Sequence, residues 1–211
     1  NQDYLYLDHA ASTPMRKSAM DKYIEAESYG YANSSGGHKL SRNSKNLLED
    51  SREKIAELLN AAQGEIVFTS GGTEADNWTI KSLFNSERPN DNLVTSNIEH
   101  EAVIASAEWV SSNGFHTKYA KSDKNGLVTK DEFLGQVDND TKVASLMWGN
   151  NETGIIQPIK DIAREIKTIN SSTLFHSDVV QGIISDNIDF HKNGIESAAV
   201  SAHKILSLIH I

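Results

Sequence analysis

Five short polar motifs in this sequence contain side chains that could do chemistry together. Each motif follows an apolar segment about as long as a β-strand, so all five would come directly after strands. The motifs are Ser70-Gly71-Gly72-Thr73-Glu74, Asn97-Ile98-Glu99-His100-Glu101, Asn150-Asn151-Glu152-Thr153-Gly154, Asp178-Val179-Val180-Gln181 and Ser201-Ala202-His203-Lys204.

The first motif is typical of an anion site. Gly71 and Gly72 let the backbone approach an anion closely, and the helix expected after them offers unpaired N–H groups and partial positive charge. Thr73 adds a hydroxyl group. The motif is neither a P-loop nor a dinucleotide fingerprint, because both defining spacings are absent. The alternative interpretation is an ordinary glycine turn with Thr73 as helix cap, and the motif alone fits both an anion site and such a turn.

The next three motifs offer a ring, an amide and a carboxylate. His100 could stack on an aromatic ring or transfer a proton. The amides around Asn151 could hold a ring oxygen. Asp178 follows an apolar segment, where a carboxylate is costly to bury unless it pairs with a cation such as a protonated pyridine nitrogen.

The last motif offers an amine. A lysine at the end of an apolar strand can have a lowered pKa, which would make Lys204 nucleophilic toward an aldehyde. Ser201 and His203 could help to hold a phosphate. Each motif alone also fits a structural role, such as a helix cap, a polar turn or a surface lysine. Together the five motifs match the needs of pyridoxal 5'-phosphate held as a Schiff base.

Strands and helices are expected to alternate along the chain. Predicted strands cover residues 5–7, 65–69, 92–95, 142–147, 173–176 and 198–200. Predicted helices cover 74–83, 101–110 and 159–169, and leucines and isoleucines between 40 and 59 fall on one further helical face. This order predicts an α/β fold, with a mostly parallel sheet flanked by helices on both faces. In such sheets functional residues gather at the carboxyl ends of the strands, where the motifs lie.

Composition excludes several classes of function. The 211 residues carry 20 Lys and Arg against 29 Asp and Glu, a net charge of −9 that argues against nucleic acid or an acidic membrane as partner. No cysteine is present, so these residues hold no disulfide, thiolate metal site or cysteine nucleophile. The histidines show no metal-binding helical spacing, so no metal is expected. No apolar run could span a membrane and no signal peptide is visible, so a cytoplasmic location is expected.

The motifs and their order resemble cysteine desulfurases of the NifS/IscS type, in the class V aminotransferase family. The resemblance covers residues 4–205 and also includes Tyr6-Leu7-Asp8-His9-Ala10-Ala11-Ser12-Thr13-Pro14, Asn33-Ser34-Ser35 and His176-Ser177. It implies the large domain of the aspartate-aminotransferase fold, incomplete at its C-terminus. The expected division is an N-terminal arm at 1–15 and a partial cofactor-binding domain at 16–205.

The resemblance implies a role for each candidate residue. Lys204 corresponds to the Schiff-base lysine and proton carrier, and Asp178 to the partner of the pyridine nitrogen. His100 corresponds to the residue that stacks on the ring and takes part in proton transfer. The remaining implied contacts are Gln181 and Asn151 to the ring oxygen and the substrate side, and Gly72, Thr73, Ser201 and His203 to the phosphate.

The implied reaction takes sulfur from L-cysteine and leaves L-alanine and a persulfide on an enzyme cysteine. The parent enzyme is expected to be a homodimer that passes sulfur to an iron–sulfur scaffold or a tRNA-thiolation protein. A selenocysteine lyase, another class V aminotransferase and a non-enzymatic anion-binding module are the alternatives.

The chain departs from the family after Lys204. The family's persulfide cysteine and its substrate-binding arginine lie downstream, so this chain is expected to be inactive alone. Residues 206–211 read Leu-Ser-Leu-Ile-His-Ile where the family continues with a glycine-containing turn. Because a common transposon sequencing adapter encodes this hexapeptide, residues 206–211 are expected to be translated adapter.

Overall fold

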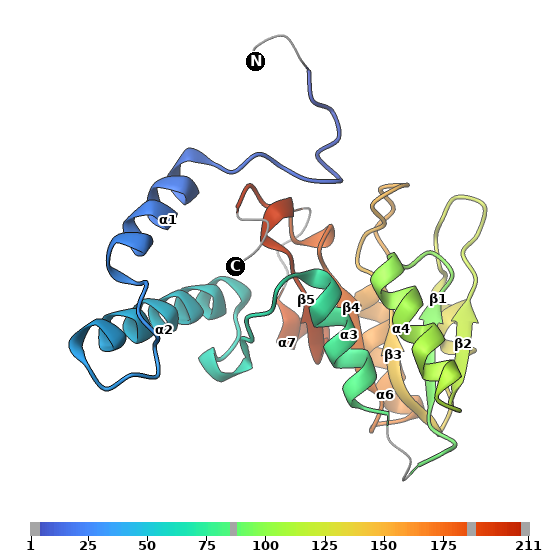
Figure 1. Cartoon of the computed structure of the whole chain (residues 1–211). Helices are drawn as coiled ribbons and strands as arrows, with labels where there is room; N and C mark the ends of the chain where they lie inside the picture. The colour runs from blue at the N-terminus through green and yellow to red at the C-terminus, as the bar shows by residue number, and fades with distance from the viewer. Residues whose placement is uncertain (1–4, 85–87, 185–188, 208–211) are drawn as a thin grey trace. The chain divides into compact units, whose positions relative to one another are not determined.

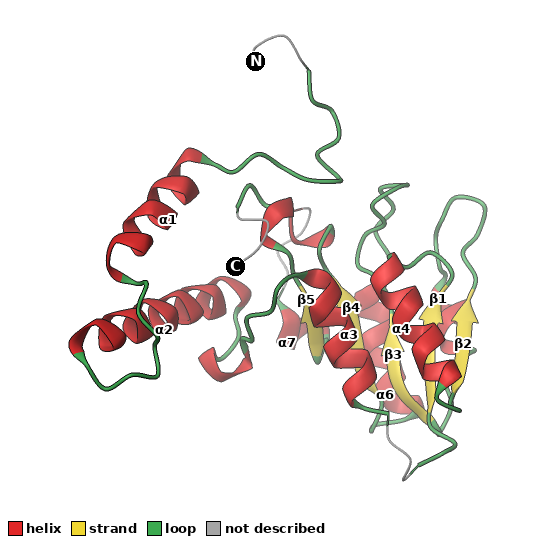
Figure 2. Cartoon of the chain, in the orientation of Figure 1, coloured by secondary structure: helices red, strands yellow, loops and turns green. Residues whose placement is uncertain are grey.

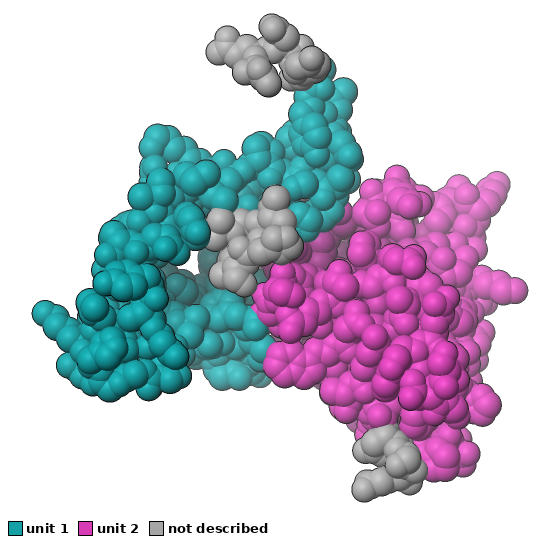
Figure 3. Space-filling view, in the orientation of Figure 1, with its two compact units in different colours: residues 1–68, 202–211 teal, residues 69–201 magenta. Residues whose placement is uncertain are grey.

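The computed structural model describes residues 5–84, 88–184 and 189–207. These residues form two compact units, coloured separately in Figure 3. Unit 1 comprises residues 1–68 and 202–211, and unit 2 comprises residues 69–201. Most of the proposed adapter segment, residues 208–211, lies outside the described residues.

Unit 1 is built on two helices, α1 (Lys17–Tyr29) and α2 (Lys39–Leu59). The Nδ1 atom of His38 accepts a hydrogen bond from the N–H of Ser41 and so caps the start of α2. The predicted apolar face of α2 exists but is incompletely covered, since Leu58 is 81% exposed. This unit also contains two short 3-10 helices, η1 (Gln63–Glu65) and η3 (Ala202–Lys204).

Unit 2 contains a five-stranded sheet in which every strand pair is parallel. The spatial order is β2-β1-β3-β4-β5, visible in Figures 1 and 2. The strands are β1 (Asn92–Ser96), β2 (His116–Ala120), β3 (Thr141–Ser145), β4 (Leu174–Asp178) and β5 (Ser197–Ala199). The predicted α/β class with a parallel sheet is therefore confirmed.

Helices cover both faces of this sheet (Figure 1). One face packs against α3 (Gly72–Ser82) and α4 (Glu101–Ser112). The other face packs against α5 (Lys130–Leu134), α6 (Ile159–Ile169) and α7 (Phe190–Asn193), and the short η2 (Gly182–Ile184) follows β4. The strands have two apolar faces because successive side chains alternate: Leu93 faces α4, and Val94 faces the opposite layer. Among the described residues, no helix is long and apolar enough to cross a bilayer.

The amphipathic pattern of α6 shows how the sequence fixes a helix against the sheet. Its buried residues Ile159, Ile162, Ala163 and Ile166 recur at helical spacing and form one apolar stripe. The structure starts and ends this helix at the predicted residues. The predicted helices at 74–83 and 101–110 and the later strands are also present, with ends that differ by at most two residues.

Two predicted strands are wrong. Residues 5–7 and 66–69 are in neither a helix nor a strand, and Glu65 ends η1. The described part of the chain supplies no neighbouring strand to bond with either segment. The carbonyl of Ile66 instead accepts a hydrogen bond from Arg52, whose guanidinium lies over the ring of Phe68. An apolar run alone cannot make a strand, because the ladder needs a partner.

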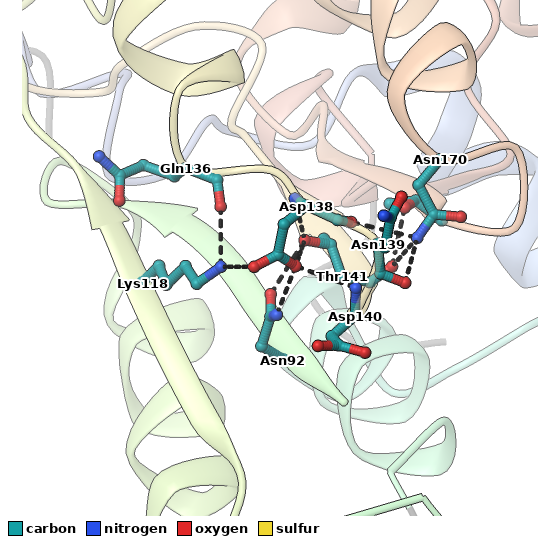
Figure 4. A network of polar contacts seen from close by, with 9 residues as sticks. Asn92, Lys118, Gln136, Asp138, Asn139, Asp140, Thr141 and Asn170 are labelled. Atoms are coloured by element: carbon teal, nitrogen blue, oxygen red, sulfur yellow. Dashed lines mark hydrogen bonds and ion pairs between the residues drawn. The ribbon is translucent and has the colours of Figure 1, made fainter. Parts of the chain in front are cut away.

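Polar side chains organise the amino ends of the strands in unit 2 (Figure 4). The carboxylate of Asp138 accepts hydrogen bonds from Lys118, Asn92 and Thr141. Asn170, which follows α6, donates to the carbonyls of Asp138 and Thr141. This network joins β1, β2 and β3 to the end of α6.

Asp138 should therefore stabilise the fold in a pH-dependent way. Its burial works against the charged form, but the donors Lys118, Asn92 and Thr141 outweigh it and lower the pKa of the carboxyl group to about 2. The ordinary value is 3.8, so the stabilisation is complete above about pH 4 and is lost as the pH falls to about 2.

We expect Asp138→Asn to lower the free energy of unfolding at pH 7 by about 1 kcal/mol, because a half-exposed carboxylate is partly screened by solvent. Denaturant unfolding at pH 7, and at steps between pH 4 and pH 2, measures the difference. Asp140→Asn removes the same charge from an exposed neighbour and should have little effect. Equal losses in the two variants would contradict the assignment.

Candidate active site

Asp178 lies at the carboxyl end of β4, and only 6% of it is exposed. Its Oδ1 atom accepts a hydrogen bond of 2.9 Å from the N–H of Val180. Burial, and then the charge of Asp76, raise the pKa of the Asp178 carboxyl to about 6. Within the described residues, no lysine or arginine forms an ion pair with Asp178. The site thus holds a buried carboxylate that a bound cation would stabilise.

The start of α3 lies close to this carboxylate. Gly71 has a φ of +154°, a backbone conformation that favours glycine, and the helix begins at Gly72. A Cβ atom on Gly72 would lie 3.1 Å from Val180 Cγ2 and 3.8 Å from the Cβ of Ser201. The exposed Thr73 follows in the first turn. The helix N-terminus, Val180 and the buried Ser201 therefore meet in unit 2, as an anion cradle requires.

His100 caps the N-terminus of α4 and is exposed. Its Nδ1 atom accepts a hydrogen bond of 3.1 Å from the N–H of Ala102. A neutral ring in this position carries its proton on Nε2. The hydrogen bond to Ala102 thus fixes the ring through Nδ1, and its Nε2–H group can donate to a ligand.

Glu99 is a residue of this site to which no role was assigned from the sequence. Its Oε1 atom accepts hydrogen bonds from Ser96 Oγ, at 2.7 Å, and from the N–H of Met147, at 3.0 Å. Its Oε2 atom is buried and has no hydrogen-bond partner among the described residues. Burial raises the pKa of the Glu99 carboxyl to about 8, and the charges of Asp178 and Asp76 add to the effect. A protonated Glu99 therefore joins the ends of β1 and β3 directly before His100.

The Asn150–Gly154 turn contains two asparagines in different settings. Asn150 is buried, donates to the carbonyl of Ile98 and accepts from the N–H groups of Glu152 and Thr153. Asn151 is exposed at the turn. Asn150 therefore holds the turn together, while the side chain of Asn151 is the one available to a ligand.

Gln181, another predicted contact, lies three residues after Asp178 and is half-buried. A role for Gln181 toward a ring oxygen stays a prediction.

Lys204 and His203 belong to unit 1, in η3. The ammonium group of Lys204 donates hydrogen bonds to the carbonyls of Ala10 and Ala11. The carbonyl of His203 accepts from both the N–H and the hydroxyl of Thr13. These bonds attach η3 to the N-terminal arm, and the roles of Lys204 and His203 toward a cofactor stay predictions.

A model of one family matches almost the whole chain. The model is described as aminotransferase class V and matches residues 5–208. The chain belongs to the class V aminotransferase family.

The relatives found by sequence are named cysteine desulfurases. The chain is 37% identical to the cysteine desulfurase IscS of Methanosarcina thermophila, covering 95% of this chain and 49% of the relative. It is 33% identical to the IscS-like cysteine desulfurase of Mycobacterium tuberculosis, covering 94% of this chain and 52% of that protein. The chain thus spans about half the length of these relatives.

Solved structures agree on the fold. A NifS-like protein superposes with a TM-score of 0.91 at 35% identity, over 95% of this chain and 55% of its own. A structure titled SspA in complex with cysteine superposes with a TM-score of 0.90 at 32% identity, over 96% of this chain and 58% of its own. The architecture of the class V enzymes is therefore present in these residues.

Glu99 should make stability fall as the pH rises. Its folded pKa of about 8 lies above the ordinary value of 4.5, so the folded state holds a proton that the unfolded state loses between these two pH values. We expect the stability of Glu99→Gln relative to the wild type to rise by a few kcal/mol from pH 5 to pH 8, since the amide cannot ionise.

Thermal and denaturant unfolding across pH 5–8 measures this difference. Glu101→Gln, at the exposed start of α4, is the matched control and should leave the pH dependence unchanged. A Glu99→Gln variant that follows the wild-type pH dependence would show that Glu99 is ionised in the fold.

Proposed function

We propose that this chain supplies the pyridoxal phosphate-binding part of a cysteine desulfurase. The single observation that carries the proposal is the buried carboxylate of Asp178, which pairs with no lysine or arginine among the described residues and lies beside the N-terminus of α3. The family match and the names of the relatives support it. When bound, pyridoxal phosphate supplies an electron-poor ring that withdraws electrons from the substrate carbon.

The residues present fit this cofactor. A pyridine nitrogen that carries a proton is a cation, and Asp178 is a buried acceptor that would hold that proton in place. The N–H groups at Gly72 and Thr73, with the hydroxyl of Ser201 and the ring of His203, would bind the phosphate. His100 would cover the ring and pass a proton through Nε2.

The remaining predicted residues would act around the ring. Asn151 and Gln181 would donate hydrogen bonds to its oxygen and orient the substrate. The amine of Lys204 would bind the cofactor's aldehyde carbon and later move a proton at the substrate carbon.

L-cysteine is the proposed substrate, with alanine and a persulfide as products. The chain itself contains no cysteine, so the sulfur must leave on a thiol that these 211 residues do not supply. A homodimeric parent and an acceptor protein for iron–sulfur assembly or tRNA thiolation complete the proposal.

Borohydride reduction in the presence of pyridoxal phosphate tests the lysine. We expect a stable cofactor adduct that peptide mapping places on Lys204, and its loss in Lys204→Ala.

Asp178→Asn should weaken cofactor affinity at least about tenfold, because a neutral amide cannot hold the ring proton as a carboxylate does.

Lys192→Ala, in α7, is the control and should keep both the adduct and the affinity. A folded wild-type chain that forms no adduct would overturn the proposal and favour an anion-binding module without cofactor.

A further inference from the structure

Three hydrogen bonds link four polar side chains beneath the candidate site, and we call this set of residues, Asp76, His176, Ser197 and Thr79, the circuit. His176 Nε2 lies 3.0 Å from Asp76 Oδ1, and His176 Nδ1 lies 3.1 Å from Ser197 Oγ. Ser197 Oγ in turn lies 2.8 Å from Thr79 Oγ1. The circuit therefore runs from α3 to β4, on to β5 and back to α3.

Two members of the circuit, Asp76 and His176, are buried where polar groups are costly, while Thr79 and Ser197 are half-buried. His176 is fully buried, and Asp76 is 1% exposed. The same layer holds Ile80, Leu93 and Val143, so the surroundings are apolar. A buried ion pair or hydrogen-bonded pair of this kind adds little net stability compared with apolar side chains of equal volume. A gain in folding stability therefore does not by itself explain why Asp76 and His176 are buried together.

The circuit does fix geometry. Asp76 and Thr79 are three residues apart and lie on one face of α3, while His176 and Ser197 are paired in register between β4 and β5. An apolar helix face can slide or rotate on a sheet at small cost, but hydrogen bonds from two positions of the helix are lost when it moves. The circuit therefore favours the observed placement of α3 on the strands.

The placement of α3 sets the distance between two parts of the candidate site, the start of α3 and the carboxylate of Asp178. Gly72 begins α3 four residues before Asp76, and Asp178 ends β4 two residues after His176. The two parts of the site meet at Val180, whose N–H donates to Asp178 and whose side chain lies against Gly72. A shift of α3 by even 1 Å would change the distance between the phosphate cradle and the carboxylate.

We propose that Asp76 and His176 are positioning residues, which hold the phosphate cradle at the start of α3 and the carboxylate of Asp178 at the spacing that pyridoxal phosphate requires. This inference rests on the proposed function. Neither side chain touches the cofactor in this assignment; both act through the elements that carry Gly72 and Asp178.

The decisive variant is the double substitution Asp76→Ala with His176→Leu. It removes the polar pair at nearly constant volume and leaves Ser197 and Thr79 bonded to each other. We expect unfolding stability close to the wild type, but an affinity for pyridoxal phosphate reduced at least about tenfold. His176→Gln keeps a donor toward Asp76 and should retain most of the affinity.

A second readout needs no cofactor. In the cofactor-free chain, the amide resonances of Gly72 and Thr73 should move in the double variant and stay near the wild-type positions in His176→Gln. Ser106→Ala is the control, since this buried hydroxyl on α4 donates only to the carbonyl of Ala102. It should change neither the affinity nor these amides.

The outcomes separate this inference from the proposed function. A wild-type chain that does not bind pyridoxal phosphate contradicts the proposed function, and the amide comparison then decides the inference. A folded double variant with unchanged amides, or with cofactor affinity within about twofold of a binding wild type, overturns it. If the double variant does not fold, Asp76→Ala alone removes the Asp76–His176 bond and leaves His176 bonded to Ser197. Unchanged amides in that variant overturn the inference equally.

Discussion

Burial of three carboxyl groups near one edge of a parallel sheet is the constraint on which this site depends. Asp76, Glu99 and Asp178 are all at least nine-tenths buried, where an unpaired charge is costly. The cost of burying the charge is reduced in a different way for each carboxyl group. Asp76 is paired with His176, and Glu99 keeps its proton because its pKa is raised to about 8. Among the described residues, the carboxylate of Asp178 accepts a hydrogen bond from the backbone N–H of Val180 and pairs with no lysine or arginine, so it keeps its capacity to accept a cationic ligand.

The three carboxyl groups influence one another's pKa through their charges. The charges of Asp76 and Asp178 both raise the pKa of Glu99, and the charge of Asp76 raises that of Asp178. A proton retained on Glu99 removes one of the negative charges from the group. The edge can then hold the ionised Asp178 that a protonated ring needs, without a cluster of three anions.

The parallel sheet explains why these groups meet. All five strands point the same way, so the turns after β1, β3 and β4 lie at one edge. Glu99 follows β1 and bonds to Met147 after β3, while Asn150 bonds back to Ile98. The polar network around Asp138 performs the corresponding task at the amino ends (Figure 4). Polar contacts at both ends therefore fix strands whose middle is apolar.

The local features of this protein follow from its sequence alone. The helical spacing of Ile159, Ile162 and Ile166 placed α6, and the order of the motifs indicated the class V family. Short-range periodicity suffices for such features because residues of one element share one environment. The edge strand β2 carries too few apolar residues to show this pattern and was not predicted.

Features that depend on partners far along the chain arise only when the chain folds. The apolar run at residues 66–69 has no strand beside it in the part of the chain that the structure describes, so it is not a strand. Asp76 and His176 are 100 residues apart in the sequence. Glu99 accepts a hydrogen bond from the N–H of Met147, which lies 48 residues further along the chain. No local pattern signals such pairs, because their energies arise only when folding removes both groups from water and brings them within hydrogen-bond distance.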